Sequence, residues 1–131
     1  MKSLFRAALA LALVSSLGIA QPAPAQTVKG VAQVGITQPV TKVAGKEVVT
    51  TMKVKNLSKG PIVGLRVEEY WYDKEGNPMP GGSRQLNKPL APGAVVAIEL
   101  RTPRTATMDR NSYQFTHANG QVTAKVLAKI E

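Results

Sequence analysis

Apolar and polar residues alternate along most of the chain after residue 25. Val96, Ile98 and Leu100 take one parity, while Glu99 and Arg101 take the other. Successive residues of a strand point to opposite faces, so this period of two predicts strands with one buried face. The same stretch of sequence holds no apolar stripe of helical period longer than two turns. The pattern therefore predicts an all-β protein.

Turn residues separate the predicted strands. Gly and Pro cluster at 74–78, 80–82 and 91–93, and a polar, basic connection covers 102–111. The strands that these turns delimit lie near 28–36, 46–56, 61–73, 84–88, 94–101, 112–118 and 121–130. About seven short strands at this spacing fit a single immunoglobulin-like β-sandwich over residues 26–131 best.

A hairpin closes the predicted domain. Asn119-Gly120 is the favoured pair for a two-residue type I′ turn, which needs positive φ at both positions. With this loop, His117 would face Val122, and the pairs further out would be Phe115 with Ala124 and Tyr113 with Val126. These pairs put every apolar partner on one face, so the sequence predicts a long, regular hairpin.

The strand near 61–73 allows two registers. Trp71 shares its parity with the apolar residues that precede it, but so does Glu69, and burial of a lone carboxylate is costly. A β-bulge would exchange the faces, bury Tyr70 and Tyr72, and expose Glu69. The pattern does not decide between these registers.

Residues 1–25 have the layout of a secretory signal peptide. Lys2 and Arg6 precede an apolar run at 7–20, and small residues follow at 23–25. A membrane-spanning helix needs about 20 apolar residues, and this run is shorter. We expect cleavage after residue 25 or residue 20, and delivery to the bacterial periplasm or exterior of a chain that does not span the membrane.

Composition narrows the chemistry. The 131 residues include 17 Lys and Arg, 8 Asp and Glu, one His and no Cys. Without the first 25 residues the net charge is +7, from 15 basic and 8 acidic residues. The lack of Cys excludes disulfides, thiolate catalysis and Cys-ligated zinc, and a single His excludes multi-histidine metal sites. We therefore expect no enzyme activity and no cofactor.

The remaining catalytic and metal patterns are weak. His117 and Ser112 take opposite parities of one predicted strand, so they cannot form a nucleophile and base. The acidic residues at 73–77 begin like a calcium loop, but Gly76 falls at the fourth position instead of the sixth. We expect His117 to be a rim or core residue and 73–77 to be a plain turn.

Two groups of residues are candidates for binding. Tyr70 and Tyr72 flank the only Trp and could form an aromatic platform, although a core Trp with a tyrosine rim gives the same pattern. Arg101, Arg104 and Arg110 lie in or beside the basic connection and could form one positive end of the sandwich. The predicted partner is an envelope or extracellular protein, or an anionic glycan, and not a specific nucleic acid.

Four segments occur in order between residues 46 and 101: Lys55-Asn56-Leu57-Ser58, Tyr70-Trp71-Tyr72-Asp73, Lys74-Glu75-Gly76-Asn77 and Leu90-Ala91-Pro92-Gly93. With these segments the chain resembles the FxLYD-type secreted bacterial sandwich domains. It departs from that family where Glu69 replaces the Phe and Trp71 replaces the Leu. The resemblance implies a non-catalytic role outside the cytoplasm. The positive net charge and the basic loop patch give the alternative function, a polyanion-binding surface protein.

Overall fold

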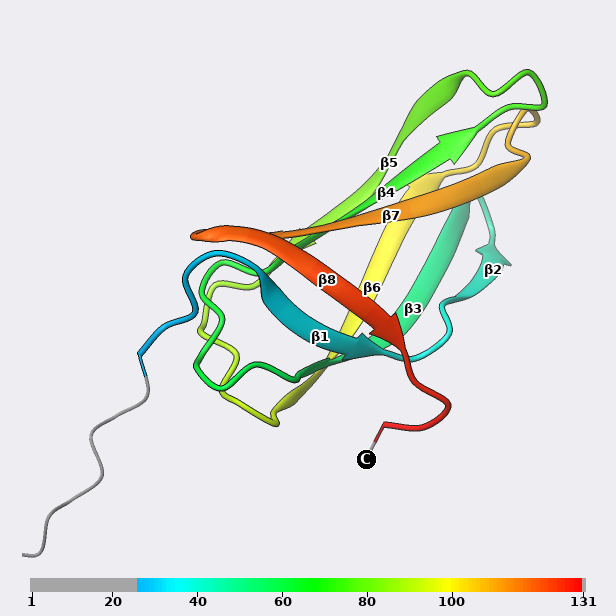
Figure 1. Cartoon of the computed structure of the whole chain (residues 1–131). Coiled ribbons are helices and arrows are strands. Elements are labelled where there is room, and N and C mark those ends of the chain that lie inside the picture. Colours follow the sequence, from blue (N-terminus) through cyan, green and yellow to red (C-terminus); the bar gives the residue numbers. More distant parts are fainter. Residues whose placement is uncertain (1–25, 131) are drawn as a thin grey trace, which may run out of the picture.

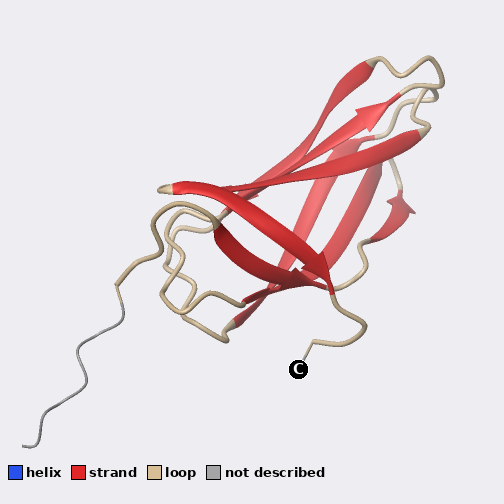
Figure 2. Cartoon of the chain, viewed as in Figure 1, coloured by secondary structure: helices blue, strands red, loops and turns tan. Residues whose placement is uncertain are grey.

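All regular structure in the described part of the chain, residues 26–130 of a computed structural model, is β-strand (Figures 1 and 2). The strands are β1 (Ala32–Ile36), β2 (Val40–Ala44), β3 (Glu47–Asn56), β4 (Arg66–Tyr72), β5 (Pro78–Gln85), β6 (Val95–Pro103), β7 (Arg110–His117) and β8 (Gly120–Val126). The predicted all-β class is confirmed. The predicted signal peptide and both of its cleavage points lie outside the described residues.

Hydrogen bonding joins the eight strands into one curled sheet. β1 and β2 pair one after the other with the same edge of β3, and β6 pairs with its opposite edge. From β1 the order continues through β8, β7, β4 and β5. At the far end of this path β5 returns to β6, where the Gly82 N–H donates to Thr102 Oγ1 over 2.8 Å. The curl encloses the core, as Figure 1 shows.

Two strands depart from the prediction. β2 was not predicted, because all five of its residues are exposed and no buried parity marks it. β5 begins at Pro78, within the segment that was predicted to be turns. β5 pairs only with β4, so no strand pairs with its other edge. The prolines of β5 lack an N–H, but no strand-to-strand hydrogen bond is lost on that edge.

The register of β4 is the one with Glu69 inside. Glu69 is 1% exposed and Trp71 is 8% exposed, while Tyr70 and Tyr72 point outward. A bulge does occur at this level, but it lies in β5, where Gly81 and Gly82 face Glu69. The pairing of β4 with β7 stays regular throughout. The alternative with exchanged faces is therefore wrong.

The β7–β8 hairpin exists, but its predicted turn and register are wrong. Thr116 faces Gln121 and His117 faces Gly120, so Ala118 and Asn119 form the loop. No non-glycine residue in 26–130 has a positive φ, which rules out the type I′ turn. The Asn119 carbonyl accepts a hydrogen bond from the Gly30 N–H, so contacts with the segment before β1 set this turn.

The longer ladder predicted between β7 and β8 is also absent. Beyond Gln121, β8 pairs in parallel with β1, with Val34 opposite Ala124 and Ile36 opposite Val126. The pairs of Phe115 with Ala124 and of Tyr113 with Val126 are therefore not formed. The observed register differs from the predicted one by two residues, which preserves the face of every side chain.

Asn56 ties the end of β3 to the two chain segments around Gly60 and Leu90. It is 1% exposed, and its amide donates to the carbonyls of Gly60 (2.9 Å) and Leu90 (2.8 Å). Its Oδ1 accepts the Ser58 N–H over 2.8 Å. The Asn-x-Ser segment therefore ends β3 and fixes the chain that leads into β4.

Candidate functional site

The outer face of β4 carries a hydrogen-bonded chain of polar side chains. Glu68 accepts from the Arg66 Nε–H and from the Tyr70 hydroxyl, both over 2.6 Å. The bond from Tyr70, and then that from Arg66, lowers the pKa of Glu68. The same bond raises the pKa of Tyr70, because loss of its proton would place two negative charges together. The hydroxyl of Tyr70 is thus fixed by its bond to Glu68.

Tyr72 continues this face toward β7. Its hydroxyl lies 3.1 Å from Ser112 Oγ, and the Arg110 guanidinium lies 5.6 Å from the centre of its ring. This distance is that of a cation–π contact. Three of the residues predicted for binding, namely Tyr70, Tyr72 and Arg110, therefore lie on one polar and aromatic face of β4 and β7.

The structure does not bring the three predicted arginines together. Arg101 lies on the outer face of β6 and pairs with Glu99 (2.6 Å) and Glu47 (3.7 Å). Arg110 lies on the outer face of β7, across the core. Arg104 follows β6, and its backbone N–H donates to the Lys46 carbonyl over 2.8 Å. The charge of Arg101 is thus already offset by two carboxylates.

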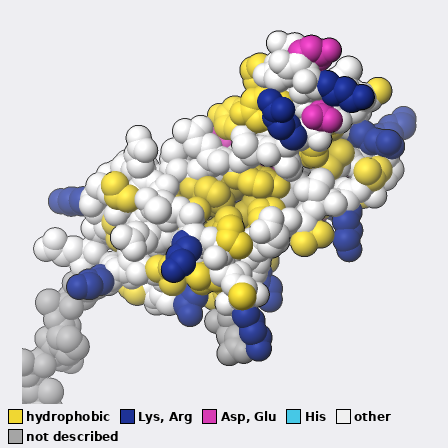
Figure 3. Space-filling view, turned by 45° about the vertical axis from the view of Figure 1, so that its right-hand side comes forward, with side chains coloured by type: hydrophobic (Ala, Val, Ile, Leu, Met, Phe, Trp, Pro, Cys, Tyr) yellow, Lys and Arg dark blue, Asp and Glu magenta, His cyan; other side chains and the backbone are white. Residues whose placement is uncertain are grey.

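The curled sheet is open on the side where β7 and β8 diverge. The two strands share two pairs at the hairpin and then separate, so a wedge opens between them (Figure 1). A hollow of about 440 Å³ fills the wedge, and Ile36, Phe115, Val122 and Ala124 supply its apolar lining. Figure 3 shows hydrophobic side chains gathered at the centre of one face of the molecule. We call the hollow between β7 and β8 the β7–β8 wedge.

Core-facing residues of both strands remain only half-buried in the wedge. Tyr113, Phe115, Val122 and Ala124 pack against the core, yet none of them is fully covered. β7 pairs with β4 along its whole length, but its other edge meets β8 only at Thr116 and His117. Within residues 26–130, the edge of β7 from 110 to 115 has no partner strand.

A buried carboxylate lies at the far end of β7 from the hairpin. Glu69 accepts four hydrogen bonds: from Thr50 (2.6 Å), Trp71 Nε1 (2.9 Å), Thr102 (3.1 Å) and Asn111 Nδ2 (3.2 Å). No basic side chain pairs with Glu69 among the described residues. Four donors and no acceptor suit the ionised form of the carboxyl group.

Tyr113 links this polar cluster to the wedge. Its hydroxyl accepts a hydrogen bond from Asn111 Nδ2 over 2.9 Å. Burial raises the pKa of Tyr113, and the negative charge of Glu69 raises it further, against hydrogen bonding to Thr41 and Thr50 that lowers it. One end of the wedge is therefore polar, and the other narrows to the hairpin.

The residues considered for catalysis lie apart. His117 is buried, with Nε2 2.6 Å from the Gly30 carbonyl, so this nitrogen carries the proton, and Nδ1 accepts the Asn119 N–H over 3.3 Å. Ser112 points outward toward Tyr72. Asp73 accepts the backbone and side-chain N–H of Asn77, which confirms the predicted turn. Residues 26–130 contain no cluster of acids and histidine suited to a metal ion.

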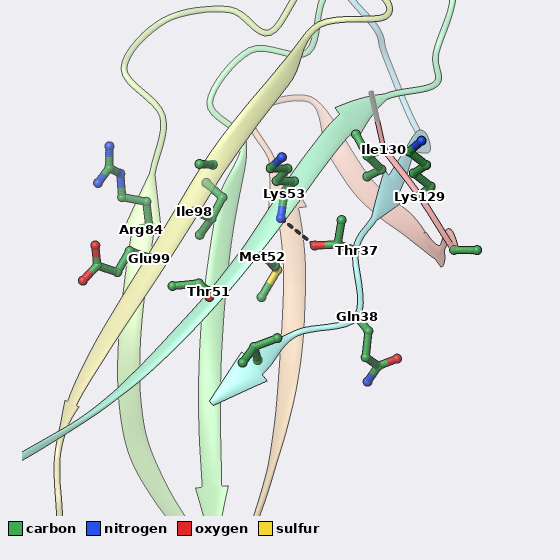
Figure 4. Close-up of a pocket in the computed structure, with 13 residues that line it drawn as sticks. Thr37, Gln38, Thr51, Met52, Lys53, Arg84, Ile98, Glu99, Lys129 and Ile130 are labelled. Atoms are coloured by element: carbon green, nitrogen blue, oxygen red, sulfur yellow. Dashed lines mark hydrogen bonds between the residues drawn. The ribbon is translucent and has the colours of Figure 1, made fainter. Parts of the chain in front are cut away.

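A larger groove lies beside the C-terminal segment (Figure 4). It has a volume of about 710 Å³, and buried Met52, Ile98 and Ile130 line it together with charged side chains such as Arg84 and Glu99. Its rim carries both signs of charge. No single ligand chemistry follows from this lining.

Comparison with protein-family models finds none that matches this chain, and comparison with curated proteins finds no match. The FxLYD-type resemblance therefore stays a prediction. In the part of the chain that the structure describes, no helix has the length and hydrophobicity needed to cross a membrane.

Proposed function

We propose that this protein is a non-catalytic binding module that acts in the bacterial periplasm or outside the cell. The observation that carries the proposal is the β7–β8 wedge. It exposes a hollow of about 440 Å³ lined by apolar and polar side chains, and β7, one of its walls, also contributes Arg110 to the outward aromatic and polar face with Tyr70 and Tyr72. An apolar hollow beside placed polar groups is the usual form of a binding site.

The predicted export signal supports the extracytoplasmic location. The side chains near the wedge support binding rather than chemistry, because its lining contains amides, hydroxyls and apolar groups. His117, the only histidine, is occupied by Gly30 and Asn119. Glu69 is enclosed by four donors and faces the core.

Cell fractionation with cross-linking of a tagged chain in intact cells tests the proposal. We expect the protein in the periplasmic or extracellular fraction, cross-linked to a partner that excess untagged protein displaces. Recovery from the cytoplasm alone, or a turnover activity that is lost on replacement of an exposed side chain, would contradict it.

A further inference from the structure

We propose that the β7–β8 wedge accepts an extended segment of a partner protein, which adds to the sheet as a strand along the free edge of β7. This inference rests on the proposed function and specifies the chemistry of the partner. In this partner segment, the side chains that point outward are acidic and those that point into the wedge are apolar.

The backbone of β7 supplies the first argument. β7 is hydrogen-bonded to β4 on one edge, and β8 occupies its other edge only at Thr116 and His117. Alternate N–H and C=O groups between residues 110 and 115 therefore point away from β4 with no strand to receive them. An unpaired edge of this kind is a template for another strand. Six residues span about 20 Å, the length of an ordinary strand.

The hollow supplies the second argument. A strand placed beside β7 would direct every second side chain inward, onto Ile36, Phe115, Val122 and Ala124. These core residues are at most partly covered on the side of the wedge, apart from Ile36, which is buried. The wedge thus lacks the side chains that a neighbouring strand would contribute. Apolar residues at alternate positions of a partner segment would fill this space.

Charge commits the occupant to an acidic segment. β7 and β8 contain Arg110 and Lys125, both exposed, and no Asp or Glu. Arg110 and Lys125 both lie on the outward face of their strands. A strand placed between β7 and β8 would carry its own outward residues on the same face as these two cations. Glu or Asp there would be attracted, and a second, equally basic copy of this chain would be repelled.

A synthetic peptide that alternates Val with Glu or Thr over about eight residues is the probe. Titrated into the purified protein, it should bind with a Kd on the order of 10–100 µM, as strand-adding peptides with few anchors do. Hydrogen exchange should then slow at alternate amides between Arg110 and Phe115. A peptide with Lys in place of Glu should bind at least about tenfold more weakly.

A matched pair of variants locates the site. Ala124→Phe fills the hollow from β8, and Thr123→Phe adds the same ring to the opposite, exposed face of the neighbouring residue. We expect the first to weaken peptide binding by at least about tenfold and the second to leave it unchanged. If Ala124→Phe fails to fold, the exchange pattern of the wild-type protein decides alone.

Four outcomes would overturn the inference. Three are no binding of the acidic peptide, binding with protection on β2 or β6 instead of β7, and a dimer of the chain that occupies the wedge. The fourth is a cross-linked envelope partner whose binding survives Ala124→Phe, which would leave the proposed binding function standing. Loss of every extracytoplasmic partner would instead contradict the proposed function itself.

Discussion

Replacing Glu69 tests whether a carboxylate without a basic partner stabilises this core. Glu69→Gln keeps the shape of the side chain but introduces an NH₂ group among four donors. The Trp71 indole can only donate, and the Thr102 oxygen already accepts the Gly82 N–H. The glutamine oxygen must therefore stay on their side, and its NH₂ must face Thr50 and Asn111.

Thr50 and Asn111, which would face the new NH₂ group, can adapt to it. The Thr50 hydroxyl lies 3.0 Å from Thr41 Oγ1 and can donate there instead, and Asn111 can rotate its amide to present the oxygen. Hydrogen bonds to a charged group contribute about 1.5–3 kcal/mol, and neutral ones about 1 kcal/mol. Weakening four bonds by about 0.5 kcal/mol each predicts a loss of about 2 kcal/mol for Glu69→Gln.

Glu69→Leu removes the acceptor altogether. Thr50, Trp71 and Thr102 are buried and would all lose a hydrogen bond to a charged acceptor, and each such loss costs about 1–3 kcal/mol. The predicted loss is at least about 3 kcal/mol, a large share of the 5–15 kcal/mol that holds a typical domain together.

Urea unfolding of the purified protein measures both losses. Trp71, the only tryptophan, contacts Glu69 and reports on this part of the core by fluorescence, and circular dichroism provides a second probe. Glu75→Gln, in the exposed turn before β5, is the control and should leave the midpoint close to that of the wild type. A Glu69→Leu protein as stable as the wild type would refute the reasoning, because three buried donors would then have lost their charged acceptor at no cost.

Four further predictions follow from single contacts. Asn56→Asp should cost about 2–4 kcal/mol in urea unfolding, since it turns a carboxylate oxygen toward two carbonyls, whereas an unchanged midpoint would mean that those bonds are unimportant. Gly120→Ala should lower the melting temperature, because its added Cβ meets the Gly30 backbone, while Asn119→Ala should not; equal effects would contradict this. In NMR titration the carboxyl group of Glu68 should have a pKa below the ordinary value of a glutamate, and Tyr70→Phe should raise it; the interaction is thus present near neutral pH and lost as the pH falls through this lowered value. If the basic surface binds polyanions, retention on heparin should fall steeply with salt, and Arg101→Gln should matter least because Glu47 and Glu99 already pair with it.

Parity along the chain predicted the faces of the strands well, because it depends only on local geometry. Val67 and Leu100 are buried as their parity predicts, and Phe115 and Val122 pack on the core even though their predicted cross-strand partners were wrong. Parity cannot tell a register from one shifted by two residues. The register of the hairpin is set by the hydrogen bond from Gly30 to Asn119 and by the pairing of β8 with β1. Gly30 and β1 both lie far from the hairpin in the sequence.

The same limit applies to the candidate site. Tyr70, Tyr72 and Arg110 were predicted separately for binding, and only the pairing of β4 with β7 places them together. The separation of Arg101 from Arg110 likewise depends on which strands pair across the core. Glu69 shows why burial was hard to predict: its four donors come from β3, β4, β6 and β7, and no local pattern announces them.

The wedge follows from the strand pairing of β7 and β8, and the polar cluster around Glu69 adds a side-chain contact to β7. β8 pairs in parallel with β1 over Ala32–Ile36. This pairing takes β8 away from β7 after two residue pairs. β7 then has β4 on one edge only, paired from Arg110 to Thr116. Asn111 adds a contact between β7 and the core, because its amide donates to Glu69 of β4. β7 is therefore held along one edge and open along the other from 110 to 115, which is the geometry that a strand-binding edge requires.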